Sequence, residues 1–448
     1  MHLPFFRLAW LAALLLLAGC STTPAQSART GSDLTGSDLT GSDLTGPEQT
    51  RPEPAPLLLI SIDALRADYL GKGDTPHLDR LARQGVRAEG MIPSYPSLTF
   101  PNHFTLVTGL RPDRHGVVHN TMREEGLGDF RVADLAAVGN GRWWRAEPIW
   151  VSAEKAGLPT AIWAWPGSAA EIDGVRPTRW KPYDESVPAA QRADDMARWM
   201  EEPAATRPRF AALYLEMVDG AGHAYGPDAP QTREAVREAD AAVGRLIDAL
   251  ARKRMLDRVN VIVVSDHGMA TVPPGHVVAV EDMVPVEDAA VISIGQSVGI
   301  APRAGRVEAA EKRLLGRHDH YQCWRKSELP ARWHYGHNPR VPPIVCQMDE
   351  GWDAIPAANA AKRPPGATRG SHGYDPSLPS MRATFIAHGP AFRKGRVIPP
   401  FDNVDVYPLM ARLLKIPARE NDGDIAPLLP ALEPMPQPAS EPKIPPQH

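Results

Sequence analysis

Three short apolar runs, each followed within a few residues by an aspartate, constrain the fold of this chain more than any other feature. The runs span 57–62, 210–215 and 261–265, and the aspartates that follow them are Asp63, Asp219 and Asp266. Continuous apolar runs of this length are typical of strands that are buried on both faces of a parallel sheet. Helical patterns alternate with them, most clearly over 231–253. We therefore predict an α/β fold with a mostly parallel central sheet and helices on both faces.

Two segments interrupt this alternation. Residues 143–199 and 273–370 are rich in Pro, Trp and Gly and have no regular period, so we expect loop-rich insertions there. A further strand is expected at 383–387. With 448 residues, 43% of them hydrophobic, the chain can bury a large core, and we expect one folded domain at 57–427. The Pro-rich residues 428–448 are expected to form a loose tail.

The three aspartates are joined by histidines at similar places. In open α/β sheets, ligands bind beyond the carboxyl ends of the strands, where these aspartates would lie. One such aspartate alone is most often a helix N-cap, and one histidine alone is most often a surface or core residue. Together they form a set that suits two zinc sites with open positions for water or substrate. The histidines are His223, His267 and His372.

The spacing of one pair in this set has a structural implication of its own. Asp219 and His223 are four residues apart, but Gly220 and Gly222 lie between them. Glycine lowers helix stability, so we expect this segment to be a loop that wraps around a ligand.

A threonine precedes a helix that is opened by a proline. Thr99 lies two residues before Pro101, and the apolar residues Phe104, Leu106 and Val107 follow. Thr99 is thus expected at or beside the helix N-cap, where free N–H groups and the helix dipole favour a phosphate or an alkoxide. A plain capping role is the alternative. Two metal ions can clamp a phosphoryl displacement and activate a bound hydroxyl, and Thr99 is the candidate for that hydroxyl.

The N-terminus has the pattern of an exported lipoprotein. Residues 1–20 carry one formal charge, Arg7, and an apolar run over 8–17 that is too short for a comfortable membrane span. The run ends in Leu17-Ala18-Gly19-Cys20, which resembles a bacterial lipobox, so we expect a lipid anchor on Cys20 and a place in the cell envelope. An ordinary signal peptide with a chance cysteine is the alternative. Residues 21–56, with three Gly-Ser-Asp-Leu-Thr repeats, are expected to be a flexible tether.

Two cysteines remain after Cys20. Because an exported protein matures in an oxidising compartment, we expect a disulfide between Cys323 and Cys346, with two buried thiols as the alternative. The formal net charge of −4 and the scattered basic residues disfavour a nucleic-acid duplex as partner. We expect a monomer that meets the membrane only through its anchor.

Taken together, these motifs resemble those of the nucleotide pyrophosphatase/phosphodiesterase family of the alkaline phosphatase superfamily, in a bacterial form. The resemblance runs in order from 57 to 408. The matching segments are Ile60-Ser61-Ile62-Asp63, Thr99-Phe100-Pro101-Asn102-His103, Asp219-Gly220-Ala221-Gly222-His223, Ser265-Asp266-His267-Gly268 and His372-Gly373-Tyr374.

The resemblance implies a set of roles. One zinc ion would be held by Asp63, Thr99, Asp266 and His267, and the other by Asp219, His223 and His372. Thr99 would be the nucleophile and would form a covalent phospho-threonine. Asn102 would donate a hydrogen bond to a non-bridging phosphate oxygen, with a capping or turn role as the alternative. Tyr183 would stack on a nucleobase and Phe100 would adjoin the nucleophile, although core packing is an equal interpretation for Phe100.

The expected activity is therefore hydrolysis of nucleotide phosphodiester or pyrophosphate bonds to nucleoside 5′-monophosphates. One alternative uses the same site on lysophospholipid or choline phosphodiesters. Another is a non-catalytic surface protein that binds zinc. Structural zinc sites are closed by four protein ligands, whereas the second site here has three, and this difference favours an enzyme.

Overall fold

The computed structural model describes residues 54–434. The predicted signal peptide, Cys20 and nearly all of the predicted tether, together with residues 435–448, lie outside this range. Within the described range, no helix has the length and apolar character needed to cross a membrane.

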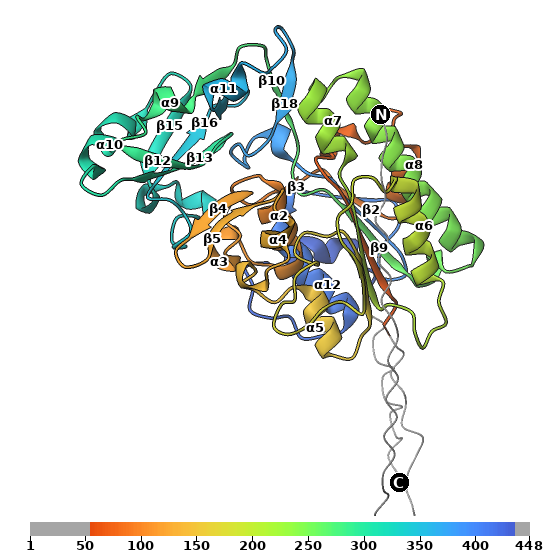
Figure 1. Cartoon of the computed structure of the whole chain (residues 1–448). Coiled ribbons are helices and arrows are strands. Elements are labelled where there is room, and N and C mark those ends of the chain that lie inside the picture. The colour runs from red at the N-terminus through yellow and green to blue at the C-terminus, as the bar shows by residue number, and fades with distance from the viewer. Residues whose placement is uncertain (1–53, 435–448) are drawn as a thin grey trace, which may run out of the picture. The chain divides into compact units, whose positions relative to one another are not determined.

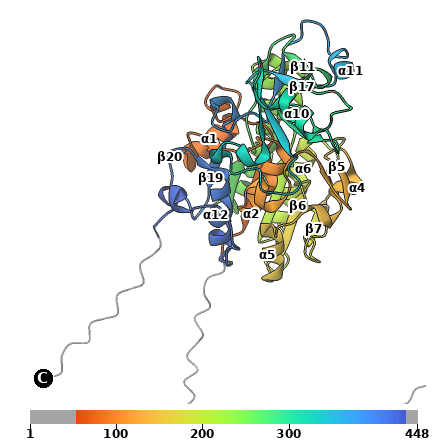
Figure 2. The same cartoon turned by 90° about the vertical axis from the view of Figure 1, so that its left-hand side faces the viewer.

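The core of the fold is an eight-stranded sheet. Its strand order is β20-β2-β19-β9-β1-β8-β6-β7. The bounds are β1 Leu57–Ile62, β2 Val86–Ala88, β6 Thr160–Trp163, β7 Arg179–Lys181, β8 Phe210–Leu215, β9 Asn260–Val264, β19 Phe385–His388 and β20 Arg396–Ile398. Only β19 is antiparallel to its neighbours, and all other neighbouring strands are parallel. The predicted mostly parallel sheet is confirmed, and Figure 2 shows its two ends, β20 and β7, on opposite sides.

Helices cover both faces of this sheet, as Figure 1 shows. One face packs against α1 (Pro76–Gln84), α6 (Ala189–Met200) and α8 (Pro230–Arg252), and the other against α2 (Thr99–Thr108), α5 (Ile149–Lys155) and α12 (Val406–Leu414). Alternate residues of β1 enter the two cores, since Leu58 and Ile60 belong to one cluster and Leu57 and Leu59 to the other. This two-sided burial is why β1 is apolar at every position except Ser61.

The predicted insertion at 273–370 carries a second, antiparallel sheet with its own buried cluster. Its strands are β12 Ala289–Ser293, β13 Ser297–Pro302, β14 Gly316–Arg317, β15 Tyr321–Arg325 and β16 Ile344–Met348, and α9 (Val280–Met283) and α10 (Val307–Leu314) accompany them. Cys323 and Cys346 face each other across β15 and β16 and form a disulfide, which confirms the predicted pair.

Two predicted boundaries differ from the structure. Residues 143–199 are not simply an insertion, because β6 and β7 complete the central sheet and α6 covers it. These strands are too short to stand out among the surrounding Pro and Trp residues. The folded part also continues past 427, because Leu428, Ala431 and Leu432 are buried against the core.

Smaller elements complete the description. The remaining helices are α3 Pro112–His115, α4 Leu135–Val138, α7 Met217–Tyr225 and α11 Ala357–Ala360. The remaining strands are β3 Met91–Ile92, β4 Thr121–Glu124, β5 Gly128–Arg131, β10 Ala270–Val272, β11 Val277–Ala279, β17 Asp353–Ile355, β18 Arg369–Ser371 and β21 Phe401–Asp402. Single 3-10 segments span Ala67–Tyr69, Gly141–Trp143, Leu256–Arg258, Lys326–Glu328, Ala331–Trp333, Pro379–Met381, Asn403–Asp405 and Ala426–Ala431.

Candidate metal centre and active site

The carboxyl ends of the central strands bring the predicted ligands together. Asp63 directly follows β1, and its N–H donates to the carbonyl of Leu215 at the end of β8. Asp266 and His267 come just after β9, the other neighbour of β1. The expected gathering of polar residues at this edge of the sheet is therefore what the strand order produces.

Helix α7 supplies two more of the predicted ligands. The segment from Asp219 to His223 was expected to be a loop because of its glycines, and this prediction is wrong. The segment is helical, and its glycine at 222 provides space rather than a bend, because a Cβ atom there would lie 2.9 Å from the Met269 methyl group. Gly370 on β18 is needed for the same reason, since a Cβ atom there would lie 2.4 Å from the Gly222 carbonyl oxygen. The helix can thus lie against β18, and its i, i+4 spacing puts Asp219 and His223 on one face.

Three of the predicted ligands of the first zinc ion lie around the Nε2 atom of His267. Its distances are 2.9 Å to Asp266 Oδ2, 3.6 Å to Asp63 Oδ1 and 3.3 Å to Thr99 Oγ1. Ligands that lie about 2.0–2.1 Å from a tetrahedral zinc ion are separated from each other by about 3.3 Å. The four groups therefore have a spacing that one zinc ion can bridge.

The second predicted set is equally compact. Asp219 Oδ1 lies 3.5 Å from His223 Nε2 and 3.4 Å from His372 Nε2, and the two Nε2 atoms are 3.1 Å apart. The two sets adjoin, because the rings of His267 and His372 stack with their centroids 3.7 Å apart. Two adjacent cations are the arrangement that stabilises both oxygens of an in-line phosphoryl transfer.

Hydrogen bonds to backbone carbonyls orient all three histidine rings. The Nδ1 atoms of His223, His267 and His372 lie 3.0, 2.9 and 2.9 Å from the carbonyl oxygens of Gly370, Gly268 and Ser97. Because a carbonyl oxygen only accepts, each Nδ1 carries the proton and each Nε2 lone pair is left for a metal ion.

The three carboxylates each keep one buried oxygen without a hydrogen bond. These atoms are Asp63 Oδ1, Asp219 Oδ1 and Asp266 Oδ2. Burial, and then the charges of Asp266 and Asp219, raise the pKa of Asp63 well above its usual value. Burial also acts to raise the pKa of Asp266, but His267 and His103 outweigh it and hold this pKa well below its usual value. Buried, unpaired carboxylate oxygens that face one another fit a site for divalent cations.

A cavity of about 740 Å³ opens over these residues. Its floor includes Thr99, the first residue of α2, whose side chain is nearly buried. Its wall is largely apolar and aromatic, and three of its residues are large hydrophobic side chains that remain exposed. These are Leu135 at 65%, Tyr183 at 39% and Trp180 at 37% exposure. An apolar wall over a polar floor fits a substrate with a phosphate at one end and a ring or other apolar group at the other.

Comparison with known proteins identifies the family. The family model described as type I phosphodiesterase / nucleotide pyrophosphatase matches residues 57–375. The chain belongs to this family. The predicted family and the predicted class of enzyme, a hydrolase of phosphoric diesters, are thereby confirmed.

Similar proteins come from distant sources. An uncharacterised pyrophosphatase/phosphodiesterase of Schizosaccharomyces pombe is 33% identical over 389 residues, which cover 84% of this chain and 80% of the relative. The venom phosphodiesterase of Naja atra is 33% identical over 386 residues, and the match spans 83% of this chain but only 45% of the venom enzyme. A similar solved structure is that of murine ectonucleotide pyrophosphatase / phosphodiesterase 5, as an inactive threonine-to-alanine variant in complex with AMP. It superimposes on this chain with a TM-score of 0.79 at 33% sequence identity, and the match covers 85% of this chain and 100% of the murine chain.

One residue expected at this phosphodiesterase site is not in it. Asn102 is fully buried, and its amide nitrogen donates to the carbonyl oxygens of Pro96 and Leu98. Its amide oxygen accepts from the Ser94 N–H and from the amide of Asn403. An asparagine amide has no further capacity, so Asn102 shapes the turn before α2 and has no group left for a phosphate. The structure thus favours the alternative turn role.

A different asparagine lines the phosphodiesterase cavity. The side-chain oxygen of Asn120 accepts a hydrogen bond of 3.0 Å from the N–H of Phe100, next to Thr99. The bond orients the amide at the floor of the cavity, and no hydrogen bond of its nitrogen is found in the described structure. In the sequence Asn120 follows Val117-Val118-His119, and only the folded chain brings it near Thr99.

We predict that Asn120→Ala lowers kcat by roughly 10²–10³, because the amide is placed to donate to an oxygen on which charge develops during phosphoryl transfer. Steady-state kinetics with a nitrophenyl nucleotide ester measures the effect. Asn102→Ala is the matched comparison and should act mainly through stability, seen as a lower melting temperature. A larger loss of kcat at Asn102 in a protein that melts like the wild type would contradict this assignment.

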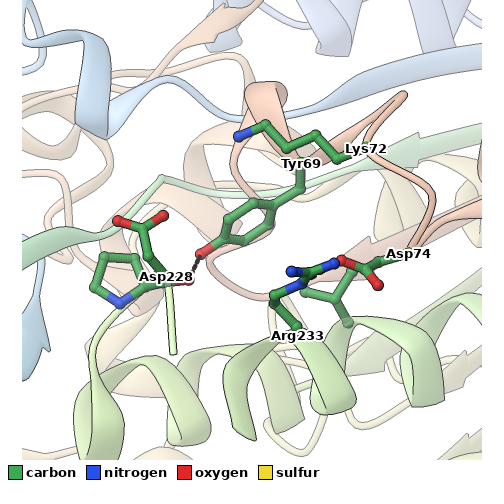
Figure 3. A pocket seen from close by; sticks show the side chains of 7 residues that line it. Tyr69, Lys72, Asp74, Asp228 and Arg233 are labelled. Carbon is green, nitrogen blue, oxygen red and sulfur yellow. Dashed lines mark hydrogen bonds and ion pairs between the residues drawn. The ribbon is translucent and has the colours of Figure 1, made fainter. Parts of the chain in front are cut away.

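A second cavity, of about 300 Å³, lies beyond the C-terminal end of α7 and is shown in Figure 3. Most of its polar groups are paired with protein: Arg233 binds Asp74 at 2.7 Å, Lys72 binds Asp68 at 3.0 Å, and the Tyr69 hydroxyl donates to the Pro227 carbonyl. It has neither the ligand set nor the unpaired carboxylates of the larger cavity, which we therefore take as the site of phosphodiester hydrolysis.

Proposed function

We propose that the chain is a two-zinc nucleotide phosphodiesterase and pyrophosphatase that releases nucleoside 5′-monophosphates through a phospho-threonine at Thr99. The observation that carries the proposal is the position of the Thr99 hydroxyl. It lies 3.3 Å from His267 Nε2, at the floor of the cavity and within the set of unpaired carboxylate oxygens. A hydroxyl in a plain capping role would have no need of that setting.

The residues divide the work as follows. Two zinc ions, when bound by the two ligand sets, would lower the pKa of a bound hydroxyl and neutralise charge on the phosphoryl oxygens. Thr99 Oγ gives up its proton and attacks phosphorus, so the Oγ–P bond forms while the bond from phosphorus to the leaving oxygen breaks and the leaving oxygen takes up a proton. A water molecule then attacks the phospho-threonine, the P–Oγ bond breaks, and Thr99 regains its proton. The amide nitrogen of Asn120 is placed to donate to an oxygen of the reacting phosphate, whereas the first turn of α2 adds little, because the Phe100 N–H is bonded to Asn120, Pro101 has none and the Asn102 N–H is bonded to Leu98.

Nucleotides are supported as substrates by two further observations. Phe100 and Tyr183 both line the cavity and offer aromatic surface on which a base can stack. The similar murine structure holds AMP, and the replacement of a threonine by alanine made that protein inactive.

Tyr183→Ala is predicted to raise KM for nucleotide esters roughly 5- to 150-fold with a smaller change in kcat, because stacking is worth about 1–3 kcal/mol per base. Nitrophenyl esters without a base should be much less affected. Steady-state kinetics on both kinds of ester measures the difference. An equal loss on both would mean that Tyr183 supports the fold or the ligands rather than the base.

The function is tested on the purified chain by zinc analysis and by turnover of a nitrophenyl nucleotide ester, with lysophosphatidylcholine as the competing substrate. We expect about two zinc ions per chain and release of a nucleoside 5′-monophosphate. Turnover of lysophosphatidylcholine without nucleotide cleavage would replace this proposal with the lipid alternative. Bound zinc without turnover of either substrate would favour a non-catalytic zinc protein.

We also propose that the enzyme is anchored in the cell envelope by a lipid on Cys20, and this rests on Leu17-Ala18-Gly19-Cys20 alone. Cys20→Ser should move the protein from the membrane fraction to the soluble fraction with unchanged specific activity. Fractionation with an activity assay measures both. A wild-type protein that is soluble would contradict the anchor.

A further inference from the structure

One buried histidine beside the catalytic cavity has no part in the roles described so far. His103 lies in α2, one turn after Thr99, and is fully buried. Its ring meets the edges of Trp165 and Tyr214, with centroid distances of 5.1 and 5.0 Å. The ring is therefore held in a fixed position between α2 and the carboxyl end of the sheet.

The two ring nitrogens of His103 contact every segment that supplies an oxygen to the first metal site. Nδ1 lies 2.9 Å from the carbonyl oxygen of Thr99 and 3.3 Å from Asp266 Oδ2. Nε2 lies 2.8 Å from the hydroxyl of Ser61, which is two residues before Asp63 on β1. One imidazole thus joins the start of α2, the end of β9 and the end of β1.

The partners determine where the ring proton lies. Both groups near Nδ1 are acceptors only, so Nδ1 carries the proton, and Nε2 accepts from the Ser61 hydroxyl. The other oxygen of Asp266, Oδ1, accepts a hydrogen bond of 3.3 Å from the Ala64 N–H and lies 3.3 Å from the Ser265 hydroxyl, whose proton goes to the His267 carbonyl oxygen at 2.7 Å. The carboxylate is thus held from both ends, while Oδ2 faces His267.

We infer that His103 is a positioning residue that holds Asp266 and the start of α2 together, so that Asp266 Oδ2 and Thr99 Oγ1 are presented to the same metal ion. The inference rests on the proposed function, since it assigns an outer partner to the first of the two metal sites. Outer partners that orient metal ligands commonly change metal affinity or activity 10- to 100-fold when they are replaced.

The test compares two amide variants of His103 in the full chain. An asparagine amide nitrogen can take the place of Nδ1 and still donate toward Thr99 and Asp266, whereas the glutamine amide reaches the place of Nε2 and cannot. His115→Gln is the matched control, because His115 is also fully buried near α2 but contacts Thr105 and Pro101 rather than a metal ligand. The measurements are zinc affinity by chelator competition, the melting temperature, and kcat and KM for a nitrophenyl nucleotide ester.

We expect His103→Gln to weaken one of the two zinc sites 10- to 100-fold and to lower kcat by a similar factor with little change in KM. His103→Asn should recover part of both losses, and His115→Gln should keep both zinc ions whatever its melting temperature. His103→Gln with wild-type zinc affinity and kcat would overturn the inference. Equal zinc loss in the Gln, Asn and His115 variants would also overturn it, because packing would then explain the effect.

These outcomes separate the inference from the proposed function. If the wild-type chain binds zinc and cleaves nucleotide esters but the His103 variants behave like it, only the positioning role fails. If the wild-type chain neither binds zinc nor cleaves the ester, the proposed function fails first.

Discussion

Replacing Thr99 by alanine is expected to lower kcat by at least about three powers of ten while both zinc ions stay bound. The change removes the hydroxyl at the floor of the cavity but leaves three aspartates and three histidines to hold the metal ions. Because α2 begins at Thr99 with Leu98 as its N-cap and no side-chain cap, the loss of the hydroxyl should cost the helix little stability. Steady-state kinetics together with zinc analysis measures the two quantities separately.

Thr99→Ser is the control, since its hydroxyl can still attack but its freer rotamer positions it less well, and it should keep part of the rate. Rapid acid quenching of wild-type enzyme during turnover should trap phosphate or nucleotide on the peptide that contains Thr99. Near wild-type turnover in Thr99→Ala with normal zinc content would show that water attacks directly, and Thr99 would be a helix residue only.

Removing the metal ions is expected to abolish turnover and to lower the melting temperature markedly. Asp63, Asp219 and Asp266 each contribute a buried oxygen to the ligand sets, and the charges of Asp266 and Asp219 raise the pKa of Asp63, so the carboxylates repel one another when no cation lies between them. Each site that binds zinc only in the folded state adds about 2.7 kcal/mol to the free energy of unfolding when free zinc is 100 times its dissociation constant. Calorimetry before and after dialysis against a chelator measures the shift.

Zinc added back after chelation should restore both turnover and melting temperature. The variant His223→Ala offers an internal comparison, because it removes a ligand of the second set alone and should lose about half of the metal and of the stabilisation. A chelated enzyme that keeps its melting temperature and its activity would contradict the metal sites as a whole.

The parts of the fold that the sequence predicts are those in which a short stretch of residues determines its own structure. The strands around β1 are buried on both faces, so most of their residues are apolar and the runs are visible in the sequence. Asp63 and Asp266 could be assigned to the site for the same reason, since each directly follows such a run. Strand β6 and the edge strand β7 escaped prediction because three or four residues are too few to show a period.

The parts that escaped prediction depend on contacts between distant segments. The segment Asp219–His223 is helical although it contains glycines, because these glycines let α7 pack closely against Met269 and β18. The sequence does not show that contact. Asn120 and His103 could not be assigned roles because their partners lie in other segments, such as the N–H of Phe100 and the side chain of Asp266. The phosphate-binding role expected for Asn102 does not fit, because its amide already forms hydrogen bonds with Ser94 and Pro96. The position of Asn102 in the sequence does not reveal these partners.

The short antiparallel ladder of β10 and β18 has a consequence for how such enzymes diversify. Ala270 pairs with Ser371 and Val272 with Arg369, so the chain leaves the site just after His267 and returns just before His372. The closed ladder fixes the spacing of these two predicted ligands. The roughly one hundred residues beyond it form the antiparallel sheet, and they also enter the main core through Trp333, Tyr335 and Val341. Because the entropy of closing a loop grows only slowly with its length, extra residues in the surface turns of this segment should cost the metal centre little. Exchange of the whole segment would remove part of the core as well, so variation among such enzymes is expected in the turns rather than in the segment as a unit.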